Sequence, residues 1–212
     1  FDFRTGTSGT DGNDTLTGGS GADTLLGLAG DDVITGAAGT DAMDGGHGSD
    51  VYVIGLSSHH AAAEIADTGT TGVDEIRFAA SSSTSSTRTL TLFAQDGGLE
   101  RATIGTGSGA TASTTGSTAL NLDASRAPNG LTITGNNGVN VLTGTAFADV
   151  IHANAGNDTV LAGAGDDRIA GGRGADALTG GSGRDVFVFA AGDTGQTSGF
   201  DRIQDFAKGA RG

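Results

Sequence analysis

The chain repeats a nine-residue unit in two arrays, and this period constrains its fold more than any other feature of the sequence. Each unit has glycine at one or more of positions one, two and four, and an apolar residue at position eight. Five units run from Gly9 to Val53, and six run from Gly135 to Val188. Position six holds Asp14, Asp23, Asp32, Asp41, Asp50, Asn140, Asp149, Asp158, Asp167, Asp176 and Asp185.

Each unit reads as a turn followed by a very short strand. Positions seven to nine, such as "TLT" and "VIT", place one apolar residue between polar or β-branched neighbours. The glycines before them accept positive φ at little cost and allow a sharp turn. If consecutive turns lie on opposite sides of a coil, each unit stacks on the unit two places later, with parallel strands about 4.8 Å apart. We therefore expect a solenoid whose interior is filled from position eight and whose aspartates form columns.

Columns of aspartates require a cation. Two carboxylates about 5 Å apart repel by roughly 3 kcal/mol at an effective dielectric constant of about 20. Carboxylate and carbonyl oxygens at flexible geometry favour calcium, whereas zinc prefers nitrogen or sulfur ligands and the chain has no cysteine and four histidines. The alternative is that Asp and Asn stabilise these turns through their own backbone without a metal. Eleven units in phase favour calcium.

The composition excludes several classes of protein. A net charge of −14 repels a phosphate backbone, so we expect no nucleic-acid partner. No apolar run approaches the roughly 18 residues of a membrane span, and we predict no transmembrane segment. The motifs Gly-x-Ser-x-Gly and His-Glu-x-x-His are missing. We therefore expect that this chain is no enzyme, although a larger parent protein could be one.

The units resemble the Gly-Gly-x-Gly-x-Asp-x-U-x calcium repeat of the RTX (repeats-in-toxin) family. This resemblance implies an all-β fold, a right-handed parallel β-roll solenoid in two blocks joined by a β-rich spacer. The expected parts are a first block at 1–53 with repeats at 9–53, a spacer at 54–134 with a Ser/Thr-rich loop, a second block at 135–189, and a truncated C-terminal capping segment at 190–212.

The resemblance also implies the ligands. Calcium would lie between turns two repeats apart, bound by carbonyls of positions two and four and the aspartate of the earlier turn, and by carbonyls of positions one and three and the aspartate of the later turn. In the first array these ligands are Thr10, Gly12 and Asp14 with Gly27, Ala29 and Asp32; Gly19, Gly21 and Asp23 with Gly36, Ala38 and Asp41; and Leu28, Gly30 and Asp32 with Gly45, His47 and Asp50. In the second array they are Asn154, Gly156 and Asp158 with Gly171, Arg173 and Asp176, and Gly163, Gly165 and Asp167 with Gly180, Ser182 and Asp185.

Two positions depart from the pattern. Asn140 offers a neutral amide in place of a carboxylate, and Phe147 replaces a glycine close to Asp149, which is a further expected ligand. We expect the sites at these positions to be weak or empty, with about seven calcium ions bound in all.

The resemblance implies a function outside the cell. We expect a calcium-folded module of a secreted bacterial protein, which supports export, folding and stability outside the cell. The implied partners are calcium and the type I secretion machinery of a Gram-negative bacterium, with the chain secreted or at the cell surface. Two alternatives stay open: a structural or adhesive segment of a surface layer or adhesin that assembles with calcium, and the non-catalytic tail of a secreted hydrolase or toxin. The secretion signal is expected beyond Gly212.

The remaining segments carry weaker patterns. Alternating leucines and isoleucine at 90–92, 120–122 and 131–133 indicate further strands, and the run "SSSTSSTRT" indicates an exposed loop. Whether the spacer continues the solenoid stays open. His59, His60 and Glu64 are interpreted as part of a solvated loop or short helix. Four phenylalanines are expected to close the C-terminal end of the roll: Phe187, Phe189, Phe200 and Phe206.

Overall fold

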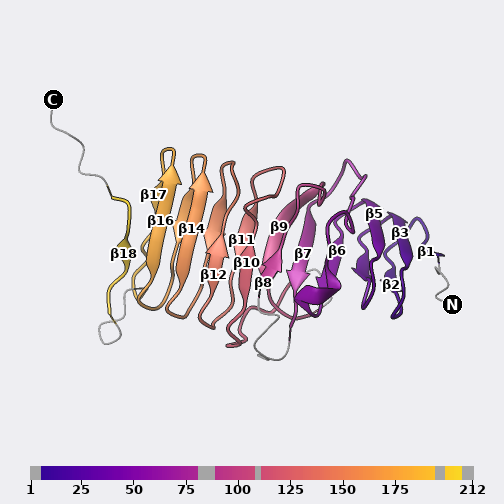
Figure 1. Ribbon diagram of the computed structural model, residues 1–212, viewed down its shortest axis with the longest axis horizontal. Coiled ribbons are helices and arrows are strands. Elements are labelled where there is room, and N and C mark those ends of the chain that lie inside the picture. Colours follow the sequence, from indigo (N-terminus) through magenta and orange to yellow (C-terminus); the bar gives the residue numbers. More distant parts are fainter. Residues whose placement is uncertain (1–5, 81–88, 108–110, 194–198, 207–212) are drawn as a thin grey trace.

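The computed structural model describes residues 6–80, 89–107, 111–193 and 199–206. These residues form one elongated stack of strands, with β1 near one end and β18 near the other (Figure 1). The described part contains one short 3₁₀ helix, η1 (Ser57–His59), and no α-helix. No helix there is long and apolar enough to cross a membrane.

The longest layer is a nine-stranded sheet that runs through both arrays and the spacer. Its strands in chain order are β2 (Thr15–Thr17), β4 (Val33–Thr35), β6 (Val51–Ile54), β7 (Asp74–Phe78), β9 (Leu99–Ile104), β11 (Thr132–Thr134), β13 (Val150–His152), β15 (Arg168–Ala170) and β17 (Val186–Phe187).

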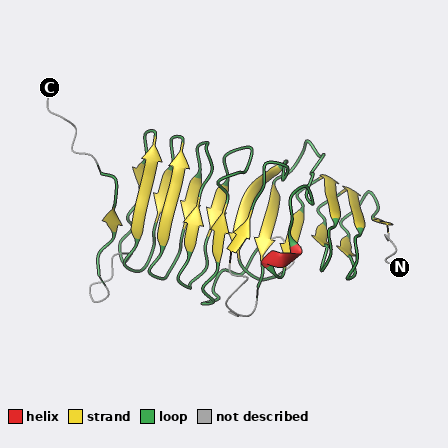
Figure 2. Cartoon of the chain, in the orientation of Figure 1, coloured by secondary structure: helices red, strands yellow, loops and turns green. Residues whose placement is uncertain are grey.

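Two shorter sheets alternate with these strands along the chain and form the second layer (Figure 2). The first contains β1 (Gly6–Ser8), β3 (Thr24–Ala29) and β5 (Ala42–His47). The second contains β8 (Thr89–Thr91), β10 (Asn121–Asp123), β12 (Val141–Thr143), β14 (Thr159–Ala164), β16 (Ala177–Ser182) and β18 (Arg202–Ile203). Neighbouring strands in all three sheets are parallel, as in a β-roll, which confirms the predicted fold class.

Within the arrays, each strand pairs with the strand two repeats later in the sequence. Leu16 of β2 lies opposite Ile34 of β4, and Val160 of β14 lies opposite Leu178 of β16. In both arrays, the position-eight side chains up to Leu178 are buried and form one continuous core between the layers. The three-residue strands β2, β4 and β15 each bury a single apolar side chain, whereas longer strands bury more, as β14 does with Val160 and Ala162.

The spacer continues the solenoid. β6 pairs with β7, β7 with β9, and β9 with β11, so the nine-stranded sheet passes from the first array to the second without a break. In the second layer, single parallel bridges join Met43 to Ile65 and Ala66 to Gly97. The strands expected from the alternating leucines are β8, β10 and β11. Most of the Ser/Thr-rich run, residues 81–88, lies outside the described residues.

Two expectations were only partly right. His59 ends the short helix η1, as one of the two expected alternatives had it, but His60 and Glu64 are buried and not solvated. His60 Nε2 lies 2.9 Å from Asp96 Oδ2 and its Nδ1 lies 3.5 Å from Glu64 Oε2, so these residues form an internal polar cluster. The phenylalanines also behave differently from expectation. Phe187 packs against the core, but the other three are half or more exposed and do not close the roll: Phe189, Phe200 and Phe206.

Candidate metal centres

The position-six carboxylates link turns that lie two repeats apart. Asp32 Oδ1 accepts a hydrogen bond of 2.8 Å from the backbone N–H of Asp14, 18 residues earlier, and Asp50 Oδ1 accepts one of 2.7 Å from Asp32. The second array repeats this bond, with 2.8 Å between Asp158 N and Asp176 Oδ1. One oxygen of each carboxylate is therefore used to stack the turns.

In many of these carboxylates the other oxygen has no partner, whereas in Asp14 and Asp23 it accepts a backbone N–H of the same turn. In the described part of the chain, a buried Oδ2 without any hydrogen-bond partner is found in Asp32, Asp41, Asp50, Asp158, Asp167, Asp176 and Asp201. Leaving one buried polar group unsatisfied costs about 1–3 kcal/mol, and more when the group is charged. A row of buried carboxylate oxygens without hydrogen-bond partners is typical of binding sites for hard cations.

Glycine at position one leaves space beside this oxygen. A Cβ at Gly27 would collide with Asp32 Oδ2 and with the carbonyl oxygen of Gly45, which belongs to the later turn. At Gly171 of the second array, a Cβ would collide with Asp176 Oδ2. The free carboxylate oxygen and the position-one carbonyl therefore face the same small space between turns.

Carbonyls at positions two and four of the earlier turn lie against the backbone of the later turn. Gly46, with φ of +88°, lies over the carbonyl of Leu28, and Gly48, with φ of +136°, lies over the carbonyl of Gly30. At position two the backbone takes positive φ in several units, including units without glycine there, as for Leu28 at +85° and Asn154 at +74°. Such backbone costs on the order of 1–3 kcal/mol and concentrates at binding sites.

The structure thus brings together the turns that were predicted to share ligands. The pairs of turns are 9–14 with 27–32, 18–23 with 36–41, 27–32 with 45–50, 153–158 with 171–176, and 162–167 with 180–185. The position-three carbonyls of His47, Arg173 and Ser182 accept hydrogen bonds from position-four N–H groups of the earlier turns. All of these ligand atoms are oxygens, which suits calcium. The individual ligand assignments stay predictions.

Burial makes the bare carboxylates hard to ionise. Loss of hydration raises the pKa of Asp50 and of Asp176 to about 6, and that of Asp158 to about 7, against the ordinary 3.8. Neighbouring carboxylates add to the rise, as Asp176 does for Asp158, while the N–H hydrogen bond to Oδ1 opposes it. Ionising these carboxylates therefore costs more in the folded chain than in water, and a bound cation would offset that cost.

The two departures from the pattern satisfy themselves without a cation. The Asn140 amide donates from Nδ2 to the carbonyl of Leu120 at 2.7 Å and accepts at Oδ1 from Asn136 N at 2.9 Å. Asp149 Oδ2 accepts from the backbone N–H of Thr145 at 2.7 Å, and the Thr145 hydroxyl also lies 3.1 Å from both oxygens. Asp14 and Asp23 accept the N–H groups of Thr10 and Gly19 in the same way, so this contact alone does not distinguish the two departures from the expected sites. Weak or empty sites at Asn140 and Asp149 stay a prediction.

Restoring the carboxylate at position 140 is expected to add a calcium ion. In Asn140→Asp the donor to the Leu120 carbonyl is lost and a free oxygen faces the space between turns, so the variant should be less stable than wild type without calcium. Native mass spectrometry in calcium should show one more bound ion. Asn137→Asp adds the same charge at an exposed position of the same turn and serves as control. Equal ion counts for both variants would contradict this account.

Sequence reasoning missed a degenerate unit in the spacer, at 69–77 (GTTGVDEIR). It keeps glycine at positions one and four, Asp74 at position six and Ile76 at position eight. Asp74 Oδ1 accepts the N–H of Asp50 at 2.8 Å, as within the arrays, but over 24 residues and not 18. Six inserted residues hide this unit from a search at fixed period, and a search that allows insertions would have found it.

Other carboxylates extend the same columns from outside the arrays. Glu64 Oε1 accepts the N–H of Asp41 at 3.2 Å, and Glu100 Oε2 accepts that of Asp74 at 2.8 Å. At the other end, Asp201 Oδ1 accepts the N–H of Asp176 at 3.0 Å. No repeat spacing indicated these three residues.

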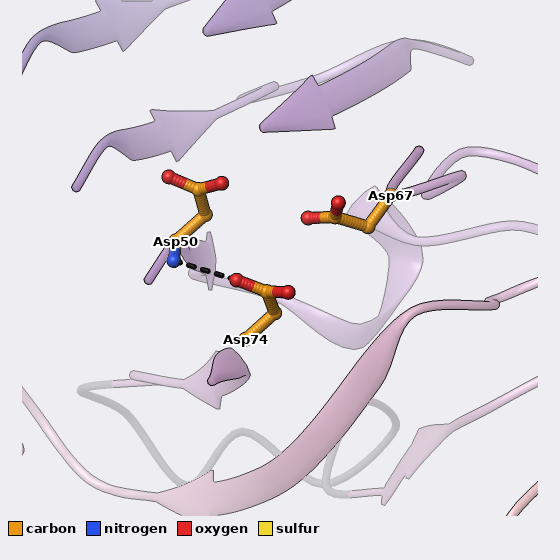
Figure 3. A group of neighbouring side chains, drawn as sticks. All are labelled: Asp50, Asp67 and Asp74. Atoms are coloured by element: carbon orange, nitrogen blue, oxygen red, sulfur yellow. Dashed lines mark hydrogen bonds between the residues drawn. The ribbon is translucent and has the colours of Figure 1, made fainter. Parts of the chain in front are cut away.

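One cluster gathers three carboxylates. Asp50, Asp67 and Asp74 each offer an oxygen, and these atoms all lie within 4.8 Å of one another (Figure 3). Burial is the main cause that raises the pKa of all three, to about 7 for Asp74. Asp67 was not among the predicted ligands.

Comparison with known proteins points to one family. The model of the RTX calcium-binding nonapeptide repeat matches four overlapping segments, residues 8–43, 17–52, 134–169 and 161–194. Together these segments cover half of the 212 residues and include both arrays. No curated protein matches the chain.

Proposed function

The chain belongs to the RTX calcium-binding nonapeptide repeat family, and we propose that it is a calcium-folded, non-catalytic module of a secreted bacterial protein. In this proposal the module is largely unfolded where calcium is scarce and folds where calcium is plentiful. The observation that supports it best is the row of buried, unpartnered Oδ2 atoms between stacked turns.

The residues of the turns fit calcium by charge and by ligand type. In the proposed sites, position-six aspartates of two turns supply negative oxygens, and carbonyls at positions two and four of the earlier turn complete the ligands. The unpartnered Oδ2 atoms and the close approach of these carbonyls to the later turn support this proposal. Bound calcium supplies the positive charge that lets these carboxylates be buried while ionised. At ten times Kd one site adds about 1.4 kcal/mol to the free energy of unfolding. About seven sites would add on the order of 10 kcal/mol, comparable with the whole stability of an ordinary domain.

Dependence of folding on calcium would suit export. The net charge of −14 keeps a calcium-free chain expanded by self-repulsion, and an expanded chain is suited to passage through the type I secretion machinery. Outside the cell, calcium modules typically have Kd of about 10⁻⁴ to 10⁻³ M. The roll would then form after export and would help neighbouring parts of the protein to fold.

A calcium titration tests the proposal. Far-UV circular dichroism should show β-structure appearing with calcium, and light scattering followed in the same titration should show whether the chain stays monomeric. Full β-structure in the calcium-free chain would contradict the proposal. Calcium-dependent growth in particle size would favour the alternative of a structural or adhesive segment.

A matched pair of variants tests which carboxylates hold the ion. Asp158→Asn removes a carboxylate whose Oδ2 is unpartnered, whereas Asp149→Asn removes one that Thr145 already satisfies. In calcium, Asp158→Asn should bind fewer ions by equilibrium dialysis and should melt at a lower temperature. Asp149→Asn should bind as many ions as wild type. The same loss of ions in both variants would show that the free oxygens do not mark the sites.

A further inference from the structure

The cluster of Asp50, Asp67 and Asp74 differs from the sites between repeats. Two of its members follow the pattern of the arrays, because Asp50 and Asp74 stand at position six of stacked units. The third, Asp67, precedes its neighbouring unit by two residues and belongs to no repeat position. Figure 3 shows the three carboxylates facing a common centre.

The cluster contains an oxygen that lacks a partner. Asp50 is fully buried, at 0% exposure, and its Oδ2 accepts no hydrogen bond. A Cβ at Gly45 would collide with this atom, so the glycine leaves space beside it. The carbonyl oxygens of Gly46 and Gly48 lie against Gly69 and Gly72 of the later unit. Carboxylates of both units and carbonyls of the earlier unit therefore lie at the junction between them.

Asp67 is held in place by hydrogen bonds that leave it able to bind. Its Oδ2 accepts from the Tyr52 hydroxyl at 2.6 Å, and its Oδ1 accepts from Gly69 N at 2.9 Å. The Tyr52 hydroxyl in turn accepts from Gly45 N at 2.7 Å. Each carboxylate oxygen has two lone pairs, so one stays available at both atoms. None of the ion pairs among the described residues involves these three aspartates.

We propose that Asp50, Asp67 and Asp74 bind one calcium ion at a composite site that joins the first array to the spacer. The choice of ion rests on the proposed function. The site itself lies partly outside the matched repeats of the first array, which end at residue 52. Three carboxylates surround this ion, against two in a site between repeats. Calcium affinity rises with the charge of the ligands, so this site fills before the others during a titration.

The composition of the chain provides a reporter for this site. Tyr52 is the single tyrosine, and there is no tryptophan. Terbium binds calcium sites and emits when a nearby tyrosine is excited, and this energy transfer falls steeply with distance. Terbium titrated into the calcium-free full chain should give tyrosine-sensitised emission from the first equivalent onward, and calcium should remove it. If emission from the wild-type protein grew only with the last equivalents of terbium, the proposal would be overturned without any variant.

Variants separate the composite site from the repeats. Asp67→Asn should lose one bound calcium ion by native mass spectrometry and weaken the first terbium step by about tenfold or more. Asp44→Asn removes a nearby carboxylate that hydrogen-bonds Thr68 and no member of the cluster, although its charge acts on Asp67. This variant should therefore bind as many calcium ions as wild type. An unchanged ion count and first step in Asp67→Asn would overturn the composite site. If the wild type binds no calcium at all, the proposed function fails instead.

Discussion

Chelating calcium is expected to abolish most of the β-structure of this chain. Seven described aspartates place a buried, unpartnered oxygen between stacked turns, and several of them face a neighbouring carboxylate as well. Without a cation each oxygen costs about 1–3 kcal/mol or more. The total is comparable with the 5–15 kcal/mol that stabilises a typical native domain. Without calcium, burial of the apolar core would have to offset this cost.

Far-UV circular dichroism before and after chelation measures this effect, and calcium in excess should restore the signal. Magnesium at the same concentration is the control for ionic strength, and it should restore little because it gives up its waters reluctantly. A chelated chain that keeps its β-signal and its melting temperature would mean that the turns are stable without metal. Turn chemistry of Asp and Asn alone would then explain the repeats.

Acid is expected to replace calcium in part. In the folded chain, burial raises the pKa of Asp50 and Asp176 to about 6 and that of Asp158 to about 7. Because the folded state holds these protons more tightly than the unfolded state, their contribution to stability is fully present below pH of about 4. It is lost as the pH rises through about 6 to 7. The calcium-free chain should therefore gain β-structure as the pH falls from about 7.5 to 5.

With calcium present, a fall in pH is expected to destabilise the folded chain, because protons and calcium compete for the same oxygens. Calcium affinity should fall over that pH range, measured by titration calorimetry at each pH. Asp158→Asn distinguishes protonation of this buried carboxylate from protonation of carboxylates elsewhere in the chain, since asparagine mimics the protonated acid. Without calcium at pH of about 7.5 this variant should be more stable than wild type. Lower stability of the variant under those conditions would contradict the assignment.

The sequence predicted the parts of the fold that depend on a fixed period. Glycine, aspartate and one apolar residue per unit are sufficient to place the short strands, the core from position eight and the stacking over two repeats. Leu16 opposite Ile34 is one instance. The same reasoning failed where the period is interrupted, because the insertion before Asp74 moves that residue out of phase with Asp50.

Contacts between distant residues could not be predicted in this way. His60 is buried because Asp96, 36 residues later, folds against it. Asp67 joins a carboxylate cluster because the Tyr52 hydroxyl holds it there. Glu64 and Glu100 accept the N–H bonds that aspartates accept inside the arrays. No repeat position identifies any of these residues, so only the three-dimensional arrangement shows what they do.

The hydrogen bonds that join position-six residues of stacked turns all run in one direction along the chain. The N–H of Asp14 is accepted by Asp32 and that of Asp32 by Asp50, so each position-six N–H is accepted by a turn that comes later. At position six, a block of turns cut from this roll would have unlike ends, with carboxylate acceptors at its N-terminal end and N–H donors at its C-terminal end. A protein fused after such a block must offer an acceptor, as Glu100 does for Asp74, while one fused before it must offer a donor.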